Sequence, residues 1–145
     1  TMEKENYPST YDDCDTVGCI IKDLNGNLFA ASSTGGRGHE YPGRVGDTPT
    51  VAGNYASKFC SVVATGKGEQ ITDDGLAVRL ETRVRDGMSI EQASRKIYLE
   101  AEKKKRRYGW ISLDKKGYWS VAHLTKYMPS VVFANNKWVL KYELD

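Results

Sequence analysis

Side chains able to carry out chemistry are concentrated in three short segments of the first half of the chain. The segments are Asp15-Thr16-Val17-Gly18, Ser33-Thr34-Gly35-Gly36 and Gly43-Arg44-Val45-Gly46-Asp47. They offer a hydroxyl nucleophile, backbone N–H donors and a pair of opposite charges that can hold a ligand, and glycine permits the sharp bends that bring such groups together. Glycine, serine and threonine are also ordinary turn residues, so plain loops are the alternative interpretation.

Threonine is a poor nucleophile unless a base removes its proton. The α-amino group of the same residue can serve as that base, and its reference pKa of about 7.7–8.0 suits proton transfer near neutral pH. In this chain Asp15 precedes Thr16, so the amine of Thr16 is part of a peptide bond. A nucleophile of this kind therefore requires cleavage between Asp15 and Thr16.

A β-hairpin is expected to position Thr16. Residues 17–22 form an apolar, β-type run, and Asn25-Gly26 favours a tight turn into a second strand over residues 28–33. Thr16 then lies at the start of the first strand. Residues 1–15 show neither a two-residue nor a 3.6-residue period, which predicts a mobile tail or linker.

The rest of the chain predicts a layered α+β fold, with strands followed by helices and then strands again. Residues 34–57, rich in glycine and proline, predict an irregular loop, and residues 59–65 a buried strand. Two amphipathic helices are expected over residues 71–85 and after a capping box formed by Ser89 and Gln92. An antiparallel meander is expected from the β-rich runs at 108–113, 118–124, 131–134 and 138–142.

Composition argues against several classes of partner. A net charge of +2 gives no reason to expect a polyanionic partner such as nucleic acid. The basic run at residues 103–107 is better explained as a solvated helix end, because cations are favourable in the last turn of a helix. No run of 18 apolar residues indicates a membrane span, and the chain as given begins with no signal-like segment.

Cysteine and histidine content points to neither disulfides nor catalysis. Three cysteines, an odd number, favour a reducing compartment and hence the cytoplasm: Cys14, Cys19 and Cys60. Cys19 and Cys60 fall on expected strands and are predicted to be buried structural thiols. His39 is expected in a loop and His123 in strand packing. No cluster has metal-ligand spacing, so neither a catalytic metal nor a cofactor is expected.

Taken together, the motifs resemble the β-subunit of the N-terminal-nucleophile asparaginase family. The ordered segments that carry the resemblance are 15–18, 25–28, 30–36 and 42–49. That family comprises plant-type L-asparaginases and isoaspartyl peptidases, glycosylasparaginase and the protease taspase. The resemblance implies that residues 1–15 are the tail of an α-subunit and residues 16–145 the β-subunit. It further implies a four-layer αββα sandwich, of which this chain supplies one half.

The resemblance also implies roles for individual residues. Thr16 is the nucleophile, and Thr34 hydrogen-bonds it. Arg44 pairs with the α-carboxylate of the substrate through two parallel hydrogen bonds, and Asp47 pairs with its α-ammonium. A local salt bridge between Arg44 and Asp47 is the plain alternative.

The motif Thr65-Gly66-Lys67-Gly68 matches the family's oxyanion hole, with Thr65 and the Gly66 amide as donors. Gly68 is expected to contact the substrate. The interval between Asp47 and Thr65 is about two residues shorter than the family pattern, so the resemblance supports the role of Thr65 less strongly than that of Thr16.

The expected activity is hydrolysis of β-aspartyl amide bonds in L-asparagine and β-aspartyl peptides, after the chain cuts itself between Asp15 and Thr16. The partners implied are an α-subunit from the same precursor, a second heterodimer in an (αβ)2 assembly and a small amino-acid or β-aspartyl substrate. A structural sodium ion would lie in the α-subunit.

Asp15 matches glycosylasparaginases, where isoaspartyl peptidases usually carry Gly, so cleavage of a glycosylated asparagine remains an alternative. A further alternative is that the chain is an uncleaved, inactive half that serves in binding or assembly. Asp47 argues against membership of the taspase branch.

Overall fold

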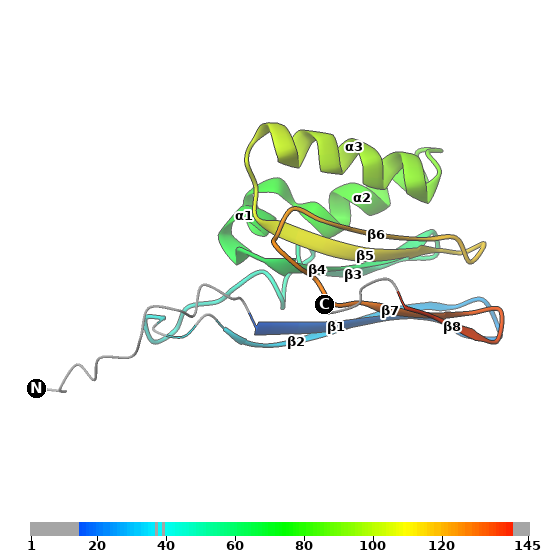
Figure 1. The fold of residues 1–145 in the computed structure, drawn as a ribbon, viewed down its shortest axis with the longest axis horizontal. Coiled ribbons are helices and arrows are strands. Elements are labelled where there is room, and N and C mark those ends of the chain that lie inside the picture. Colours follow the sequence, from blue (N-terminus) through cyan, green and yellow to red (C-terminus); the bar gives the residue numbers. More distant parts are fainter. Residues whose placement is uncertain (1–14, 37, 39, 141–145) are drawn as a thin grey trace, which may run out of the picture.

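The computed structural model describes residues 15–36, 38 and 40–140, which form three layers (Figure 1). Helices form one outer layer, a four-stranded sheet the middle layer, and two β-hairpins the other outer layer. The elements are β1 (Asp15–Lys22), β2 (Leu28–Gly36), β3 (Asn54–Ala56), β4 (Cys60–Gly66), α1 (Gly68–Asp74), α2 (Leu76–Arg85), α3 (Ile90–Lys103), β5 (Tyr108–Asp114), β6 (Trp119–His123), β7 (Val131–Ala134) and β8 (Lys137–Leu140). The predicted α+β fold class is confirmed.

The hairpin predicted around Asn25-Gly26 is present as β1 and β2. Its turn is closed by the side chain of Asp23, which accepts hydrogen bonds from the backbone and side-chain nitrogens of Asn27 at 2.7 and 2.8 Å. The antiparallel register places Thr16 opposite Thr34, and it shifts between Asp15 and Thr16. Gly18 lets β1 pack closely on the middle sheet, since a Cβ at this position would overlap Val63.

The core lies between the middle sheet and the helices. In β4 five consecutive residues are buried, as expected for a strand that is covered on both faces. The helices contribute fully buried residues that include Ile71, Leu80 and Ile97. Ser89 and Gln92 form the predicted capping box at the start of α3. None of the helices in the described part of the chain combines the length and the apolar character needed to cross a bilayer.

Three expectations for secondary structure were wrong in part. The loop expected over residues 34–57 contains the end of β2 and the short strand β3. The helix expected over residues 71–85 is two helices, because Gly75 adopts a left-handed conformation at φ 55° and ends α1. The expected four-stranded meander is divided: β5 and β6 pair in the middle sheet, whereas β7 and β8 pair only with each other among the described strands.

The structure confirms some of the predictions made for the cysteines and histidines and corrects one. Cys60 is buried, and burial raises the pKa of its thiol to about 12. Cys19 is exposed, so the prediction of a buried thiol was wrong. Its neighbour Gly18 faces Val63 of the middle sheet, and successive strand residues point to opposite faces, so Cys19 points away from that sheet. His123 lies on β6, where its Nδ1 is 3.0 Å from the carbonyl of Thr125. Cys14 and His39 lie outside the described residues.

We expect Ser94→Ala to lower the free energy of unfolding by about 1–3 kcal/mol, since it removes the partner of a buried donor. The indole N–H of the fully buried Trp110 donates to the Ser94 hydroxyl at 2.9 Å, and the hydroxyl of Ser120 donates to the same oxygen at 2.7 Å. Urea denaturation measures the loss. Ser33→Ala, at an exposed position, is the control and is expected to change stability by less than about 0.5 kcal/mol. Equal losses in the two variants would contradict the role of Ser94.

Candidate active site

A small pocket lies where the open end of the β1–β2 hairpin meets the turn before α1. It encloses about 20 Å³, room for about one water molecule. The lining residues are Thr16, Thr34, Gly36, Arg44, Gly46, Asp47, Thr48, Gly66 and Gly68. The structure therefore brings together residues from four segments that are well separated in the sequence. Of the residues singled out above, Thr65 lines a neighbouring cavity instead.

The two threonines meet because they are register partners in the hairpin. The hydroxyl of Thr16 donates to the hydroxyl oxygen of Thr34 at 3.1 Å. The backbone N–H of Gly36 donates to the same oxygen at 3.0 Å, which fixes the side chain of Thr34. Asp15 lies opposite Gly36, and the register is irregular between Asp15 and Thr16, the residue that lines the pocket.

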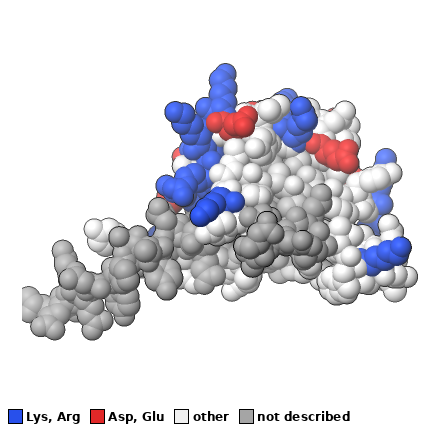
Figure 2. Space-filling view, viewed as in Figure 1, with Lys and Arg blue, Asp and Glu red and all other residues white. Residues whose placement is uncertain are grey.

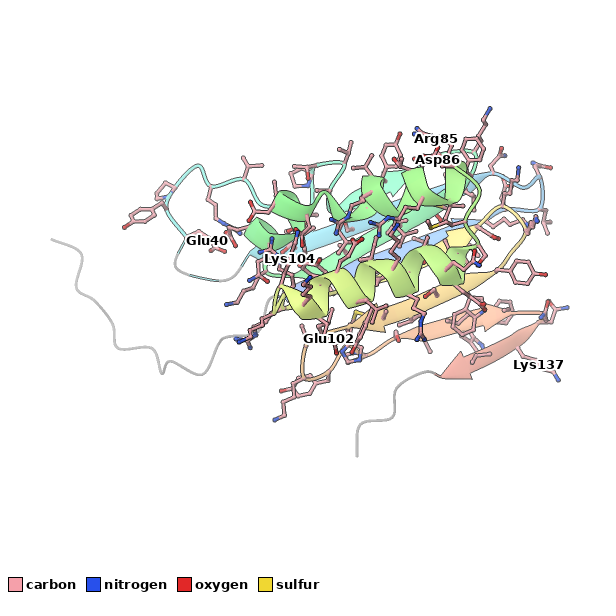
Figure 3. All side chains as sticks on the ribbon, turned by 90° about the horizontal axis from the view of Figure 1, so that it is seen from above. Glu40, Arg85, Asp86, Glu102, Lys104 and Lys137 are labelled. Carbon is pink, nitrogen blue, oxygen red and sulfur yellow. The ribbon has the colours of Figure 1, made fainter. Side chains whose placement is uncertain are left out.

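Arg44 extends from the loop between β2 and β3 and is held by two carboxylates. Its Nη2 and Nε donate to Oε1 of Glu69 at 2.7 and 3.2 Å, and its Nη1 lies 3.5 Å from Oε1 of Glu40. The hydrogen bond with Glu69 raises the pKa of Arg44, so the guanidinium stays charged. Figure 3 shows Glu40 on this loop at the same end of the molecule as α1. The ion pairs of Arg44 thus run to Glu69 and Glu40, in place of the local pair with Asp47 considered above.

Sequence reasoning missed Glu69 and Glu40. A usable signal existed for Glu69, because it is the acidic residue in the first turn of α1, directly after the Gly66-Lys67-Gly68 turn. Glu40 lies only four residues before Arg44, but in a segment predicted to be an irregular loop, where this spacing does not indicate a contact.

Asp47 is a buried carboxylate, only 7% exposed. Its Oδ2 is buried and has no hydrogen-bond partner among the described residues. Burial raises the pKa of this carboxyl, and the nearby charge of Arg44 opposes that change. Two glycines make room for the carboxylate, since a Cβ on Gly53 would lie 2.6 Å from Oδ2 and one on Gly68 2.7 Å from Oδ1. A buried carboxylate oxygen without a donor is suited to receive a cationic donor such as an ammonium group.

The turn after β4 closes the pocket with backbone alone at Gly66 and Gly68. Gly66 has φ 131°, a conformation that side-chain-bearing residues rarely adopt, and lies opposite Tyr108. The N–H of Lys67 donates to the carbonyl of Arg107 at 3.0 Å. Thr65, half-buried at the end of β4, lines a cavity of about 980 Å³ together with Thr16.

That larger cavity lies between β1, the middle sheet and the β7–β8 hairpin and has a mostly apolar lining. It adjoins the small pocket at Thr16, which lines both. Within residues 15–36, 38 and 40–140, no three acidic, histidine or cysteine side chains gather in the manner of a metal site. The chemistry available in the small pocket is thus a hydroxyl pair, backbone N–H groups and two opposite charges.

Comparison with known proteins identifies a family and several relatives that are similar to this chain. The family model described as "Asparaginase" matches residues 1–140. Proteins named isoaspartyl peptidase/L-asparaginase are 42% identical in Nostoc sp. over 70% of this chain, 43% in Synechocystis sp. over 71%, and 38% in Bos taurus over 88%. These stretches span 32%, 31% and 43% of the relatives, so the chain spans less than half of their length. Because the family model matches residues 1–140, nearly the whole chain, the chain belongs to the asparaginase family.

Proposed function

We propose that this chain is the β-half of an amidohydrolase that cleaves β-aspartyl amide bonds, in L-asparagine or β-aspartyl peptides, with Thr16 as nucleophile. The observation that carries the proposal is the hydroxyl of Thr16 at 3.1 Å from the Thr34 hydroxyl, in a pocket that also contains Arg44 and Asp47. The relatives' name, isoaspartyl peptidase/L-asparaginase, supports the same class of reaction.

Maturation comes first in this proposal. The Thr16 hydroxyl attacks the carbonyl carbon of Asp15, and the Asp15 acyl group moves from the nitrogen of Thr16 to its oxygen as an ester. Water then hydrolyses the ester, which leaves a carboxylate on Asp15 and a free α-amine on Thr16. The shift of register between Asp15 and Thr16 supports this step, because regular strand pairing is interrupted at the bond to be cut.

In the proposed turnover, the free amine of Thr16 accepts the proton of its own hydroxyl, and the oxygen attacks the side-chain carbonyl of the substrate. The negative charge that develops on the carbonyl oxygen is stabilised by the N–H of Gly66 and the hydroxyl of Thr65. Ammonia or an amine leaves with a proton, and a β-aspartyl ester remains on Thr16. Water hydrolyses this ester to aspartate and regenerates the enzyme.

Recognition of the amino-acid head group is assigned to Arg44 and Asp47. An α-ammonium group would supply the donor that the buried Oδ2 of Asp47 lacks among the described residues. The α-carboxylate would bind the guanidinium of Arg44, which already holds Glu69 on its Nε and Nη2 side. The substrate carboxylate therefore takes the remaining donors on Nη1 and Nη2 or displaces one of the two glutamates.

The proposal includes a missing half of the fold, which packs on the outer face of the hairpin layer. The hairpin layer carries exposed apolar side chains, and no described element packs on its outer side (Figure 1). They include Val17, Ile21, Phe29, Val131, Phe133 and Trp138. Because the chain spans less than half of its relatives, an α-half of the same precursor is the proposed cover. It would complete the four-layer αββα sandwich, and two such heterodimers the (αβ)2 assembly. The cytoplasmic location remains a prediction from the cysteine content.

Substrate assays test the proposed reaction. The precursor that carries this chain is incubated with L-asparagine, a β-aspartyl dipeptide and an asparagine N-glycosylated with N-acetylglucosamine, and aspartate formation is measured. The proposal predicts turnover of the first two substrates. Turnover of the glycosylated substrate alone would favour the glycosylasparaginase alternative suggested by Asp15, and no turnover of any would favour an inactive binding half.

We expect the affinity for L-aspartate, the proposed product, to weaken as the pH falls through the raised pKa of Asp47. Burial raises the pKa of Asp47 above its ordinary value, so this carboxyl takes up a proton at a higher pH than an exposed aspartate does. Only the ionised form pairs with the ammonium group, hence the Kd should rise about tenfold per pH unit below that pKa. Calorimetry between pH 4.5 and 7 measures it. Asp47→Asn is the control, and it should bind L-aspartate more weakly with a Kd that depends little on pH. If this variant kept the pH dependence of the wild-type Kd, Asp47 would be excluded as the titrating group.

A further inference from the structure

A second buried carboxylate, Asp74, lies behind the candidate active site at the end of α1. Its side chain is 1% exposed and accepts hydrogen bonds from three residues. Nζ of Lys104 and Nη2 of Arg106 donate to Oδ1 at 2.8 and 2.9 Å. Nε of Arg106 and the hydroxyl of Tyr108 donate to Oδ2 at 2.9 and 2.8 Å. Both oxygens of the carboxylate are therefore bound to the segment that joins α3 to β5.

The basic run at residues 103–107 is an exposed helix end, as predicted, except at Arg106. Figure 2 shows lysine and arginine side chains gathered over the helical layer, and Figure 3 places Lys104 at the end of α3. Arg106, however, is only 19% exposed and points to Asp74. Burial alone would raise the pKa of Asp74, but the hydrogen bonds from Arg106, Lys104 and Tyr108 outweigh it and hold the pKa well below its ordinary value. Asp74 is therefore ionised throughout the physiological range.

The segment held by Asp74 also holds the turn of the candidate site. The carbonyl of Arg107 accepts the N–H of Lys67 at 3.0 Å, and the N–H of Arg107 donates to Oε1 of Gln70 at 2.8 Å. Tyr108 lies opposite Gly66, so closely that a Cβ on Gly66 would be 2.5 Å from the Cα of Tyr108. The short helix α1 is thus tied to one segment at both ends, at its start through Lys67 and Gln70 and at its end through Asp74.

This arrangement matters because the turn has little side-chain packing to fix it. Gly66 and Gly68 have no side chains. The φ of 131° at Gly66 is a backbone conformation that glycine adopts readily and other residues rarely do. The direction of the N–H of Gly66 therefore depends on the backbone contacts that Gly66 and Lys67 make with Tyr108 and Arg107. A donor displaced by about 1 Å can reduce the rate of an enzyme about 100-fold.

We propose that Asp74 is a positioning residue, which fixes the Gly66–Gly68 turn through Arg106 and Tyr108 and so aims the donors of the oxyanion hole. This inference rests on the proposed function for the role of the turn. Asp74 itself touches no substrate. The contact between the turn and the 106–108 segment, in contrast, is a property of the structure and can be tested without any activity.

Asp74→Asn tests the proposal, because the variant keeps the shape of the side chain and removes its charge. With rates normalised to the fraction of chains that begin at Thr16, we expect kcat on L-asparagine to fall at least tenfold, with a smaller change in KM. Hydrogen exchange measured on a peptide spanning Gly66 to Gly68 should be faster than in the wild type. Tyr108→Phe, which removes one hydrogen bond and keeps the charge pair, should lose less activity than Asp74→Asn.

Glu100→Gln is the matched control. It removes an ion pair of the same helical layer, in which Nη2 of Arg83 donates to both oxygens of Glu100 at 2.7 and 2.8 Å. This variant should lower the melting temperature but leave kcat and the exchange of the turn unchanged. Unchanged kcat and exchange in Asp74→Asn, or equal losses in Glu100→Gln, would overturn the proposal. An inactive wild type would refute the proposed function instead, and the exchange comparison would still decide whether Asp74 positions the turn.

Discussion

Thr16→Ala should abolish both cleavage of the chain and hydrolysis of the amide substrate. Both reactions use the same oxygen, and alanine has no hydroxyl to replace it. By comparison with the loss of the nucleophile in other hydrolases, we expect kcat to fall by at least about 10⁴-fold. Intact mass measures cleavage, and aspartate formation measures turnover.

Two further variants separate the nucleophile from the shape of the pocket. Thr16→Ser retains a hydroxyl and should preserve both reactions at a reduced rate. Thr48→Ala alters another residue of the pocket lining to which no role is assigned, and it should remain cleaved and active. If Thr16→Ala still hydrolysed asparagine, the nucleophile would have to lie elsewhere.

Arg44→Lys should lower kcat/KM for L-asparagine about 10- to 100-fold. Lysine keeps the positive charge, but its compact ammonium group cannot make two parallel hydrogen bonds to a carboxylate. It also cannot hold Glu69 and Glu40 as the planar guanidinium does, with three nitrogens directed at the two residues. Initial rates over a range of asparagine concentrations measure the effect.

Asparagine α-amide, which lacks the α-carboxylate, is the matched substrate for this variant. The wild type should already hydrolyse it poorly, and Arg44→Lys should reduce its rate by much less than the rate on asparagine. An equal loss on both substrates would mean that Arg44 does not bind the α-carboxylate and acts on the pocket in another way.

Short-range signals explain most of what the sequence predicted correctly. The β1–β2 hairpin follows from Asn25-Gly26 between two β-type runs, and the start of α3 from the capping box of Ser89 and Gln92. Each signal lies within a few residues of the element that it defines. The break at Gly75 was missed because an isolated glycine is tolerated inside many helices, and only the left-handed conformation shows that it ends α1.

Long-range contacts explain most of what the sequence did not predict. Asp74 and Tyr108 are 34 positions apart, and Arg44 and Glu69 are 25 apart, so neither pair shows a periodic signal. Cys19 occupies a strand position that resembles core, and its exposure depends on whether another half covers that face. The candidate site residues, in contrast, were recognisable from ordered motifs, and the fold places most of them around one pocket. Their catalytic roles remain predictions.

The most direct test of the central claim is the N-terminus of the chain after maturation. The precursor is incubated at neutral pH, and intact mass and N-terminal sequencing are followed in parallel with ammonia release from L-asparagine. We predict that a new chain beginning at Thr16 appears and that activity rises in proportion to it. Activity in the uncut precursor, or a fully cut protein without activity on asparagine or a β-aspartyl dipeptide, would contradict an N-terminal Thr16 nucleophile.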